Sequence, residues 1–403
     1  MFGLSNKDYY TYLLLNLIKD KGPISRTQIK EITELRPSTI TDIIRELIEK
    51  KLVKNQGLMN SGKGRSQVLL KINSDYLCVL SISIIDKKIL FIVNTIDGII
   101  LKKIEKSIIS LLTLDQVLDL IITVSKQLIN EFSSLKFLGV GMADPGIVDI
   151  KGEFSIFSTQ FSFWEDIPLK SILEKSLELP VKVEEGSRLM ALGEKNYGHA
   201  KGVTDFFLVN LTRGIGISIV SNDTIIKGYN GTAGELGHTH VIDNGKLCMC
   251  GSYGCLETAA SQNSIVTQVK EALDTGAFSY ISEYISDLDN IQFEHIIKAM
   301  YRNDKICLSI VEKAGTYIGI ALSNLVNTLN PKLIIFDGTM CLLGDTLLNT
   351  IKTTISKYSL NLATANLEYK ISELKETSFS LGAVTMIVED YFKSKLMRQI
   401  YQD

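Results

Sequence analysis

The 24 residues from 234 to 257 restrict the possible folds of this chain more than any other segment. They read GELGHTHVIDNGKLCMCGSYGCLE, in which His238 is followed by Cys248, Cys250 and Cys255. One imidazole and three thiolates are the ligand set of a closed tetrahedral zinc site, which leaves no position open for water. We therefore expect these four residues to hold one structural zinc ion, whose binding contributes folding free energy to the loop. The alternative is three buried cysteines near a core histidine, but the glycines and polar residues of the segment are not typical of a core strand.

The composition favours a metal site over a disulfide framework. Three of the six cysteines fall within eight residues, and the opening MFGLSNKDYYTY has no basic segment followed by an apolar core. We therefore expect no secretory signal and a cytoplasmic location. No run of 18 apolar residues is uninterrupted, so we also expect no transmembrane helix. A length of 403 residues with 45% apolar and 22% charged residues is typical of a globular protein of two or three domains.

The net charge of −2 conceals a difference between two parts of the chain. Residues 1–72 contain nine lysines and four arginines against three aspartates and four glutamates, a net charge of +6. The remainder has 30 basic and 38 acidic residues, a net charge of −8. A basic N-terminal part on an acidic body suggests that the first part binds a polyanion. The alternative is an ordinary solvated helical face.

The first half of the basic part predicts two helices. Apolar residues between 9 and 18 recur at helical spacing, and a Gly-Pro pair ends that helix. Ser25 begins a second helix with Gln28 in a capping box. In this second helix we expect Ile29 and Ile32 to point inward.

A third helix is predicted from Pro37 to about Lys50. Proline suits the first helical position because the N–H that it lacks would be unpaired there. The residues expected on the buried face of this helix are Ile40, Ile43, Ile44, Leu47 and Ile48. Those expected largely on the opposite face are polar: Ser38, Thr39, Thr41, Asp42 and Arg45.

A wing is predicted after the third helix. Residues 52–54 and 67–72 read as short strands, and the loop 60–66 between them is rich in glycine and carries basic residues. Three helices and a basic wing describe a winged helix-turn-helix, whose third helix enters the major groove of DNA while the wing reaches phosphates or the minor groove. The alternative is a module for protein contacts. The residues expected to contact DNA are Ser38, Thr39, Thr41, Arg45, Lys63 and Arg65.

The body of the chain alternates between strand and helix patterns. Strands are predicted at 77–84, 89–94, 99–104, 137–142, 181–184, 206–210 and 215–221, and helices at 110–132 and 188–197. A second helix-rich half follows to residue 392. Two α/β halves with a cleft between them are expected to bind a ligand near the ends of their strands.

Several segments match motifs of one known family. They are the wing GKGRSQVLLKI, GVGMADPGIVD at 139–149, FWEDIPL at 163–169, VEEGSRLMALGE at 183–194, the metal-loop segments NGTAGELGHTHV and CMCGSYGCLE, and NPKLIIFDG at 330–338. In these segments the chain resembles the ROK family of repressors and sugar kinases, specifically its winged-helix repressor branch, which includes xylose and N-acetylglucosamine repressors. The resemblance extends over nearly the whole chain, and the zinc spacing is its most specific part.

The resemblance implies an α/β fold with an N-terminal winged helix-turn-helix and an actin-like, hexokinase-like body of two ribonuclease-H-type lobes. The DNA-binding domain would comprise residues 1–72. The first lobe would comprise 73–195 plus about 383–403, and the second lobe, with the zinc loop, 196–382.

The resemblance also implies that the kinase machinery is missing. Family kinases use an aspartate as general base for the sugar hydroxyl, and Gly186 stands at the matching position. Their first phosphate loop aligns with residues 83–88, where its aspartate and both glycines are lost, and their second with LTRGIGIS at 211–218. The glycine pair on the adenosine side has become Asp337-Gly338. Because four ATP-linked elements have changed, we expect no ATP binding and no enzyme activity.

The sugar side of the family's site is better preserved. The resemblance assigns contacts with sugar hydroxyls to Glu235, His238 and Glu257. A carboxylate can accept hydrogen bonds from two adjacent hydroxyls. His238 would bind zinc through one ring nitrogen and reach the sugar with the other. The alternative for the two glutamates is a surface or helix-capping role.

Other sugar contacts have changed. Gln160 and Glu185 stand at two further sugar-binding positions where the family has asparagine, and Arg188 replaces a third asparagine. These changes either alter the preferred sugar or abolish sugar binding.

The interpretation that joins these features is a sugar-responsive transcriptional repressor of carbohydrate-utilisation genes. Its partners would be double-stranded operator DNA and a small sugar effector, with no membrane. A homodimer or tetramer would place two recognition helices on an inverted repeat, and sugar binding would close the lobes and change their separation. The alternatives are a sugar kinase with an appended DNA-binding domain and a repressor controlled by a protein partner.

Overall fold

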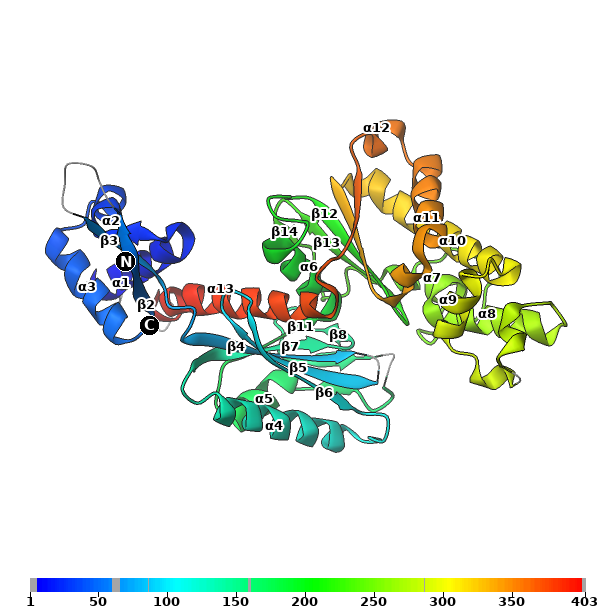
Figure 1. Ribbon diagram of the computed structural model, residues 1–403, viewed down its shortest axis with the longest axis horizontal. Coiled ribbons are helices and arrows are strands. Elements are labelled where there is room, and N and C mark those ends of the chain that lie inside the picture. The colour runs from blue at the N-terminus through cyan, green and yellow to red at the C-terminus, as the bar shows by residue number, and fades with distance from the viewer. Residues whose placement is uncertain (1–5, 60–65, 86, 159–160, 286, 401–403) are drawn as a thin grey trace.

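Three parts of the molecule follow one another in space (Figure 1). The computed structural model describes residues 6–59, 66–85, 87–158, 161–285 and 287–400. A small N-terminal module lies at one end, a first lobe lies in the middle and a second lobe lies at the other end. The long helix α13 (Ser378–Ile400) runs from the junction of the lobes back to the N-terminal module. The predicted fold class, α/β with an N-terminal helical module before a two-lobed body, is confirmed.

The N-terminal module has three helices and a sheet of order β1-β3-β2. Its elements are α1 (Asn6–Lys21), β1 (Ile24–Ser25), α2 (Arg26–Thr33), α3 (Pro37–Glu49), β2 (Val53–Met59) and β3 (Gln67–Ile72). The predicted capping box is confirmed, because the Ser25 hydroxyl accepts the Gln28 N–H at 3.2 Å and the Gln28 side chain accepts the Ser25 N–H at 2.9 Å. Strands β2 and β3 form the predicted hairpin, but Lys63 and Arg65 lie outside the described residues.

The apolar faces of α2 and α3 agree only in part with the prediction. In α3 the predicted stripe is buried at four positions and half-buried at Ile48. In α2, Ile29 is buried, but Ile32 is 48% exposed, so its predicted inward position is wrong. Three residues along a helix turn the side chain by about 300°, and α2 ends one residue later. The module core covers only a narrow face of α2, which contains Ile29. Ile32 lies next to this face and remains exposed.

Both lobes contain a five-stranded sheet of the same topology. The strand orders are β11-β7-β4-β5-β6 in the first lobe and β14-β13-β12-β15-β16 in the second. In each sheet the first three strands along the chain form an antiparallel meander. The fourth strand then pairs in parallel with the first, and the fifth pairs in parallel with the fourth. This shared topology is that of the predicted ribonuclease-H-type lobes.

The first lobe packs its sheet against two helices. The strands are β4 (Leu77–Ile85), β5 (Lys88–Thr95), β6 (Ile100–Ser107), β7 (Lys136–Asp144) and β11 (Val181–Glu185), and the helices are α4 (Leu114–Glu131) and α5 (Leu169–Leu177). A small sheet adds β8 (Ile147–Val148), β9 (Ser155–Phe157) and β10 (Glu165–Ile167). Helix α4 begins four residues later than predicted, because the Thr113 hydroxyl accepts the Gln116 N–H and caps it there.

The second lobe is richer in helices. Its strands are β12 (Phe206–Leu211), β13 (Ile215–Ser221), β14 (Thr224–Ile225), β15 (Leu333–Asp337) and β16 (Glu368–Ile371). Its α-helices are α7 (Leu256–Ala260), α8 (Gln262–Asp274), α9 (Phe293–Met300), α10 (Lys305–Leu329), α11 (Gly344–Tyr358) and α12 (Asn361–Thr364). Within the described part of the chain, α10 alone is long and apolar enough to cross a membrane. It is a core helix, because Val311, Ile318 and Leu322 are buried in the second lobe.

Two crossing helices form the junction of the lobes. Helix α6 (Gly186–Tyr197) follows β11 and shares buried cores with both sheets. It packs directly on α13, since a Cβ atom at Gly382 would lie only 1.7 Å from the Leu189 carbonyl oxygen, and one at Gly193 only 2.2 Å from that of Ser378. The two backbones are therefore in contact, which larger residues at these positions would prevent.

The other end of α13 completes the core of the N-terminal module. Ile387 and Phe392 are buried in one cluster with Leu14 and Ile18 of α1. The Asn16 side chain also donates a hydrogen bond to the Phe392 carbonyl at 3.4 Å. One continuous helix thus joins the junction of the lobes to the module.

Candidate functional site

The four predicted metal ligands lie together in the second lobe. His238 ends the 3-10 helix Leu236–His238, and Cys255 precedes α7. The ligand atoms of His238, Cys248, Cys250 and Cys255 all lie within 4.8 Å of one another. The sulfurs of Cys250 and Cys255 are 3.7 Å apart, and the Cys248 sulfur is 3.6 Å from Nδ1 of His238. Ligands at about 2.3 Å in a tetrahedron lie about 3.8 Å apart, so the cluster is consistent with a zinc site.

His238 presents its two ring nitrogens to different partners. Nδ1 faces the cysteine cluster, while Nε2 lies 3.9 Å from a carboxylate oxygen of Glu235. A metal on Nδ1 would fix the ring and leave Nε2 toward Glu235. The nearby His240 is not part of the cluster, since its ring contacts Tyr253 and Asp243 instead.

Glu235 and Glu257 lie on either side of the metal loop. Glu235 precedes the helical turn that carries His238, and Glu257 is in the first turn of α7. Burial raises the pKa of Glu235, with His238 opposing the rise and Glu257 adding to it. A Cβ atom at Gly214 would lie 2.7 Å from a Glu257 oxygen, so glycine leaves room for this carboxylate. The structure therefore brings together the three residues predicted to contact sugar hydroxyls.

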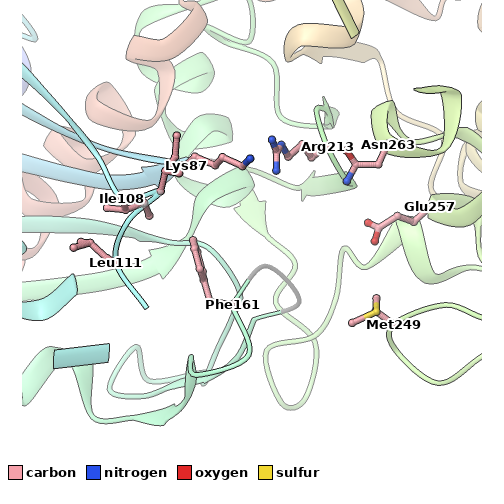
Figure 2. A pocket seen from close by; sticks show the side chains of 10 residues that line it. Lys87, Ile108, Leu111, Phe161, Arg213, Met249, Glu257 and Asn263 are labelled. Atoms are coloured by element: carbon pink, nitrogen blue, oxygen red, sulfur yellow. The ribbon is translucent and has the colours of Figure 1, made fainter. Parts of the chain in front are cut away.

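A cavity of about 450 Å³ opens beside Glu257 and the metal loop (Figure 2). Its walls come from both lobes: Lys87, Ile108, Ile109, Leu111, Phe161, Arg213, Gly214, Met249, Glu257 and Asn263. Figure 2 shows Lys87 and Arg213 extending toward each other from opposite sides. Met249, between two of the cysteines, is a wall residue, so the metal loop forms part of the cavity. Gln160 lies outside the described residues.

Glu185 has a role that its position in the motif does not indicate. Its carboxylate caps α6, accepting the backbone N–H groups of Ser187 at 2.8 Å and Arg188 at 3.1 Å. Burial raises its pKa to about 7. Contact between Glu185 and a sugar stays a prediction, beside this observed capping role.

The raised pKa of Glu185 predicts a pH-dependent stability that Glu185→Gln removes. The folded chain binds this proton more tightly than the unfolded chain, in which the pKa is near 4.5. The resulting stabilisation is complete below pH 4.5 and is lost as the pH rises through 7. Between pH 5.5 and 8.0, the unsubstituted chain should lose about 2 kcal/mol of its free energy of unfolding through this group, and Glu185→Gln should not show that loss. Urea titrations of both proteins at the two pH values measure the difference. Glu368→Gln, on an exposed edge strand, should keep the original pH dependence, and parallel curves for Glu185→Gln would contradict the expectation.

The predicted DNA-contacting residues of α3 lie on one outer face. Ser38, Thr41 and Arg45 are exposed and Thr39 is half-buried. Arg45 is paired with Asp42 at 2.7 Å, an exposed contact that DNA phosphates or base edges can replace. Arg36, directly before α3, is a further exposed cation at the start of this helix.

Comparison with known proteins decides the family. A model of the ROK family matches residues 79–390. The chain belongs to the ROK family. The xylose repressor of Caldicellulosiruptor bescii is 29% identical over 383 residues, which cover 94% of this chain and 95% of that protein. A crystal structure of a ROK family transcriptional regulator, a homologue of the Escherichia coli Mlc protein, covers 98% of this chain and 99% of that one, with a TM-score of 0.83 and 27% identity.

Kinases of the ROK family match a shorter part of the chain. A glucokinase of Halalkalibacterium halodurans is 34% identical over 251 residues, 62% of this chain and 76% of that enzyme. The repressor match covers 94% of the chain and so extends into the N-terminal module, while the family model begins after the module. Within this ROK protein, a Cβ atom at Gly186 would meet only the Asp144 carbonyl oxygen, at 3.7 Å. Position 186 therefore has room for the Cβ atom of a larger residue, but glycine there provides no carboxylate to act as a base.

Proposed function

We propose that this ROK protein is a DNA-binding transcriptional regulator, a repressor of carbohydrate-utilisation genes, whose operator affinity is set by a sugar in the cleft. The observation that carries this proposal is the continuous helix α13, which links the junction of the lobes to the core of the N-terminal module. A change between the lobes would thereby alter the position of α3.

The proposed sugar contacts are Glu235, His238 and Glu257, with Gln160 and Glu185 as further candidates. Glu257 lines the cavity, and Glu235 lies 3.9 Å from Nε2 of His238 at the metal loop. Zinc would orient His238 there. Zinc in this closed four-ligand site would hold structure and leave no open position for catalysis.

The same geometry supports a role without phosphoryl transfer. Position 186 has no side chain to accept a proton from a sugar hydroxyl. Asp337, at the adenosine side, is buried, and burial raises its pKa to about 6. A side chain here replaces one of the two glycines that the family kinases have at this place.

The proposed partners are double-stranded operator DNA, a small sugar and further copies of this chain in a cytoplasmic homodimer or tetramer. Two-fold symmetry would place two α3 helices on an inverted repeat. We propose residues 1–72 as the DNA-binding domain, 73–195 plus about 383–403 as the first lobe, and 196–382 as the second.

Sugar is expected to weaken operator binding by about 5- to 150-fold, the usual range of allosteric coupling. Fluorescence anisotropy at fixed salt, with an operator selected from random-sequence DNA, measures this change. The panel is D-xylose, D-glucose, N-acetyl-D-glucosamine and the 6-phosphates of the last two, since Lys87 and Arg213 line the cavity. Glu257→Gln should keep operator affinity and lose the sugar response.

Other outcomes would replace the proposal. Operator affinity that no sugar changes, together with a protein captured from extract that does change it, would favour control by a protein partner. ADP formation from ATP with any hexose in the panel would make the chain a kinase with a DNA-binding module.

A further inference from the structure

A segment of the second lobe reaches across to the first. Residues 227–235, here called the strap, connect β14 to the 3-10 helix that carries His238. The strap is closed on itself by a hydrogen bond from the Ala233 N–H to the Lys227 carbonyl at 3.1 Å. A Cβ atom at Gly231 would lie 2.4 Å from the carbonyl oxygen of Val148, in β8 of the first lobe. The strap therefore packs against the first lobe at its middle.

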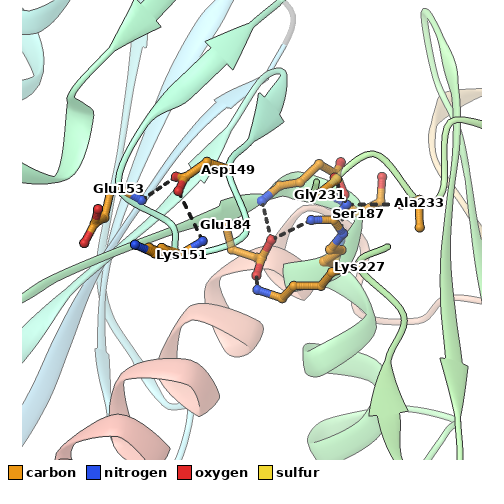
Figure 3. A network of polar contacts seen from close by, with 10 residues as sticks. Asp149, Lys151, Glu153, Glu184, Ser187, Lys227, Gly231 and Ala233 are labelled. Atoms are coloured by element: carbon orange, nitrogen blue, oxygen red, sulfur yellow. Dashed lines mark hydrogen bonds and ion pairs between the residues drawn. The ribbon is translucent and has the colours of Figure 1, made fainter. Parts of the chain in front are cut away.

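Arg188 of α6 holds the strap by its backbone. The side chain is 3% exposed, and it donates hydrogen bonds to the carbonyl oxygens of Gly231 and, at 3.1 Å, Ala233. It also pairs with Glu184 at 3.1 Å. The other carboxylate oxygen of Glu184 pairs with Lys227 of the strap (Figure 3). A single guanidinium thus joins a helix of the junction to two carbonyls of the strap.

The strap leads directly to the candidate effector site. Gly234 is fixed on β13, because its carbonyl accepts the Ile217 N–H at 3.1 Å. Glu235 follows, and the helical turn after it ends at His238. The position of Arg188 therefore bears on a carboxylate and on a metal ligand that it does not itself touch.

We propose that Arg188 is a positioning residue that sets Glu235 and His238 relative to the junction helix α6. Two carbonyl oxygens and one carboxylate surround the side chain, and the planar guanidinium has N–H donors for all three. The single ammonium group of a lysine cannot donate hydrogen bonds to all three in this arrangement. The proposal rests on the proposed function only in assigning Glu235 to the effector site. The rival explanation is a buried ion pair that stabilises the fold in general.

Hydrogen exchange in the full-length protein tests the proposal without DNA or sugar. The informative amides are Ala233, Leu236 and His238, each of which donates a backbone hydrogen bond in or beside the strap. In Arg188→Gln and Arg188→Lys we expect these amides to exchange at least tenfold faster, with no change in β4 or α10. Lys227→Met is the matched control, because it removes the other cation beside Glu184 and leaves both carbonyl bonds; its exchange should rise less than threefold.

A second readout follows the metal ligand. Zinc release to the chelator 4-(2-pyridylazo)resorcinol should be at least threefold faster in Arg188→Gln than in Lys227→Met. Unchanged strap exchange in Arg188→Gln would overturn the proposal, as would full retention of protection in Arg188→Lys or an equal increase throughout both lobes. If Arg188→Gln does not fold, Arg188→Lys decides the result alone. Both measurements give a result even if no sugar changes operator binding. The outcome of this test is therefore separate from that of the operator experiment.

Discussion

Cys250→Ser is expected to abolish zinc binding and to lower the midpoint of thermal unfolding by about 10 °C. The four ligand atoms lie within 4.8 Å of one another, and serine removes one thiolate from a closed site. Without the ion, the loop between His238 and Cys255 is held mainly by short backbone bridges such as that of Leu247 with Tyr253. Metal analysis should find about one zinc per chain before the substitution and none after it, and differential scanning fluorimetry measures the change in stability.

The control for this substitution is Cys341→Ser. Cys341 is a half-buried cysteine outside the cluster, so its loss should leave the zinc content unchanged. Retention of a full equivalent of zinc in Cys250→Ser would remove Cys250 from the ligand set. Equal destabilisation by both substitutions would show that the metal adds nothing particular to stability.

Gly382→Ala is expected to lower the free energy of unfolding by more than about 3 kcal/mol. The new methyl group would lie 1.7 Å from the Leu189 carbonyl, which is backbone and cannot rotate away. Helices α6 and α13 would have to separate. Overpacking commonly costs about 1–3 kcal/mol and occasionally more, and we expect the upper end or beyond because the clash is with backbone. Urea titration measures the difference.

Gly186→Ala is the matched control on the same helix pair. A methyl group at this position would make ordinary contact with the Asp144 carbonyl, at 3.7 Å. Replacing a helical glycine by alanine commonly stabilises by about 0.5–1 kcal/mol, so this variant should be neutral or slightly more stable. If the two variants were equally stable, close contact between the helix backbones would not be needed.

Local chemistry made part of the fold predictable. The capping box at Ser25 and the proline at the start of α3 depend only on residues within one helical turn, and both are confirmed. The clustering of His238 with Cys248, Cys250 and Cys255 was predictable because thiolates and imidazole at this spacing have few uses other than metal binding. Ile32 was wrongly placed because the burial of a short helix depends on what packs against it.

Contacts between distant segments could not be predicted in the same way. Lys87 and Arg213 belong to two segments that align with phosphate loops of the family kinases, and the structure places both on the wall of one cavity. Their convergence depends on the relative placement of two lobes. Similarly, Glu185 was assigned by its position in a motif, whereas its capping of α6 depends on the backbone direction after β11.

The arrangement of α13 has a consequence for synthesis of the chain. The core of the N-terminal module includes Val384, Ile387 and Phe392, which leave the ribosome only after both lobes have been translated. Domains commonly fold as their residues emerge, but this one lacks part of its own interior until then. A nascent chain would therefore carry an incompletely folded N-terminal module. Only chains whose synthesis has reached α13 could use this module to bind the proposed operator.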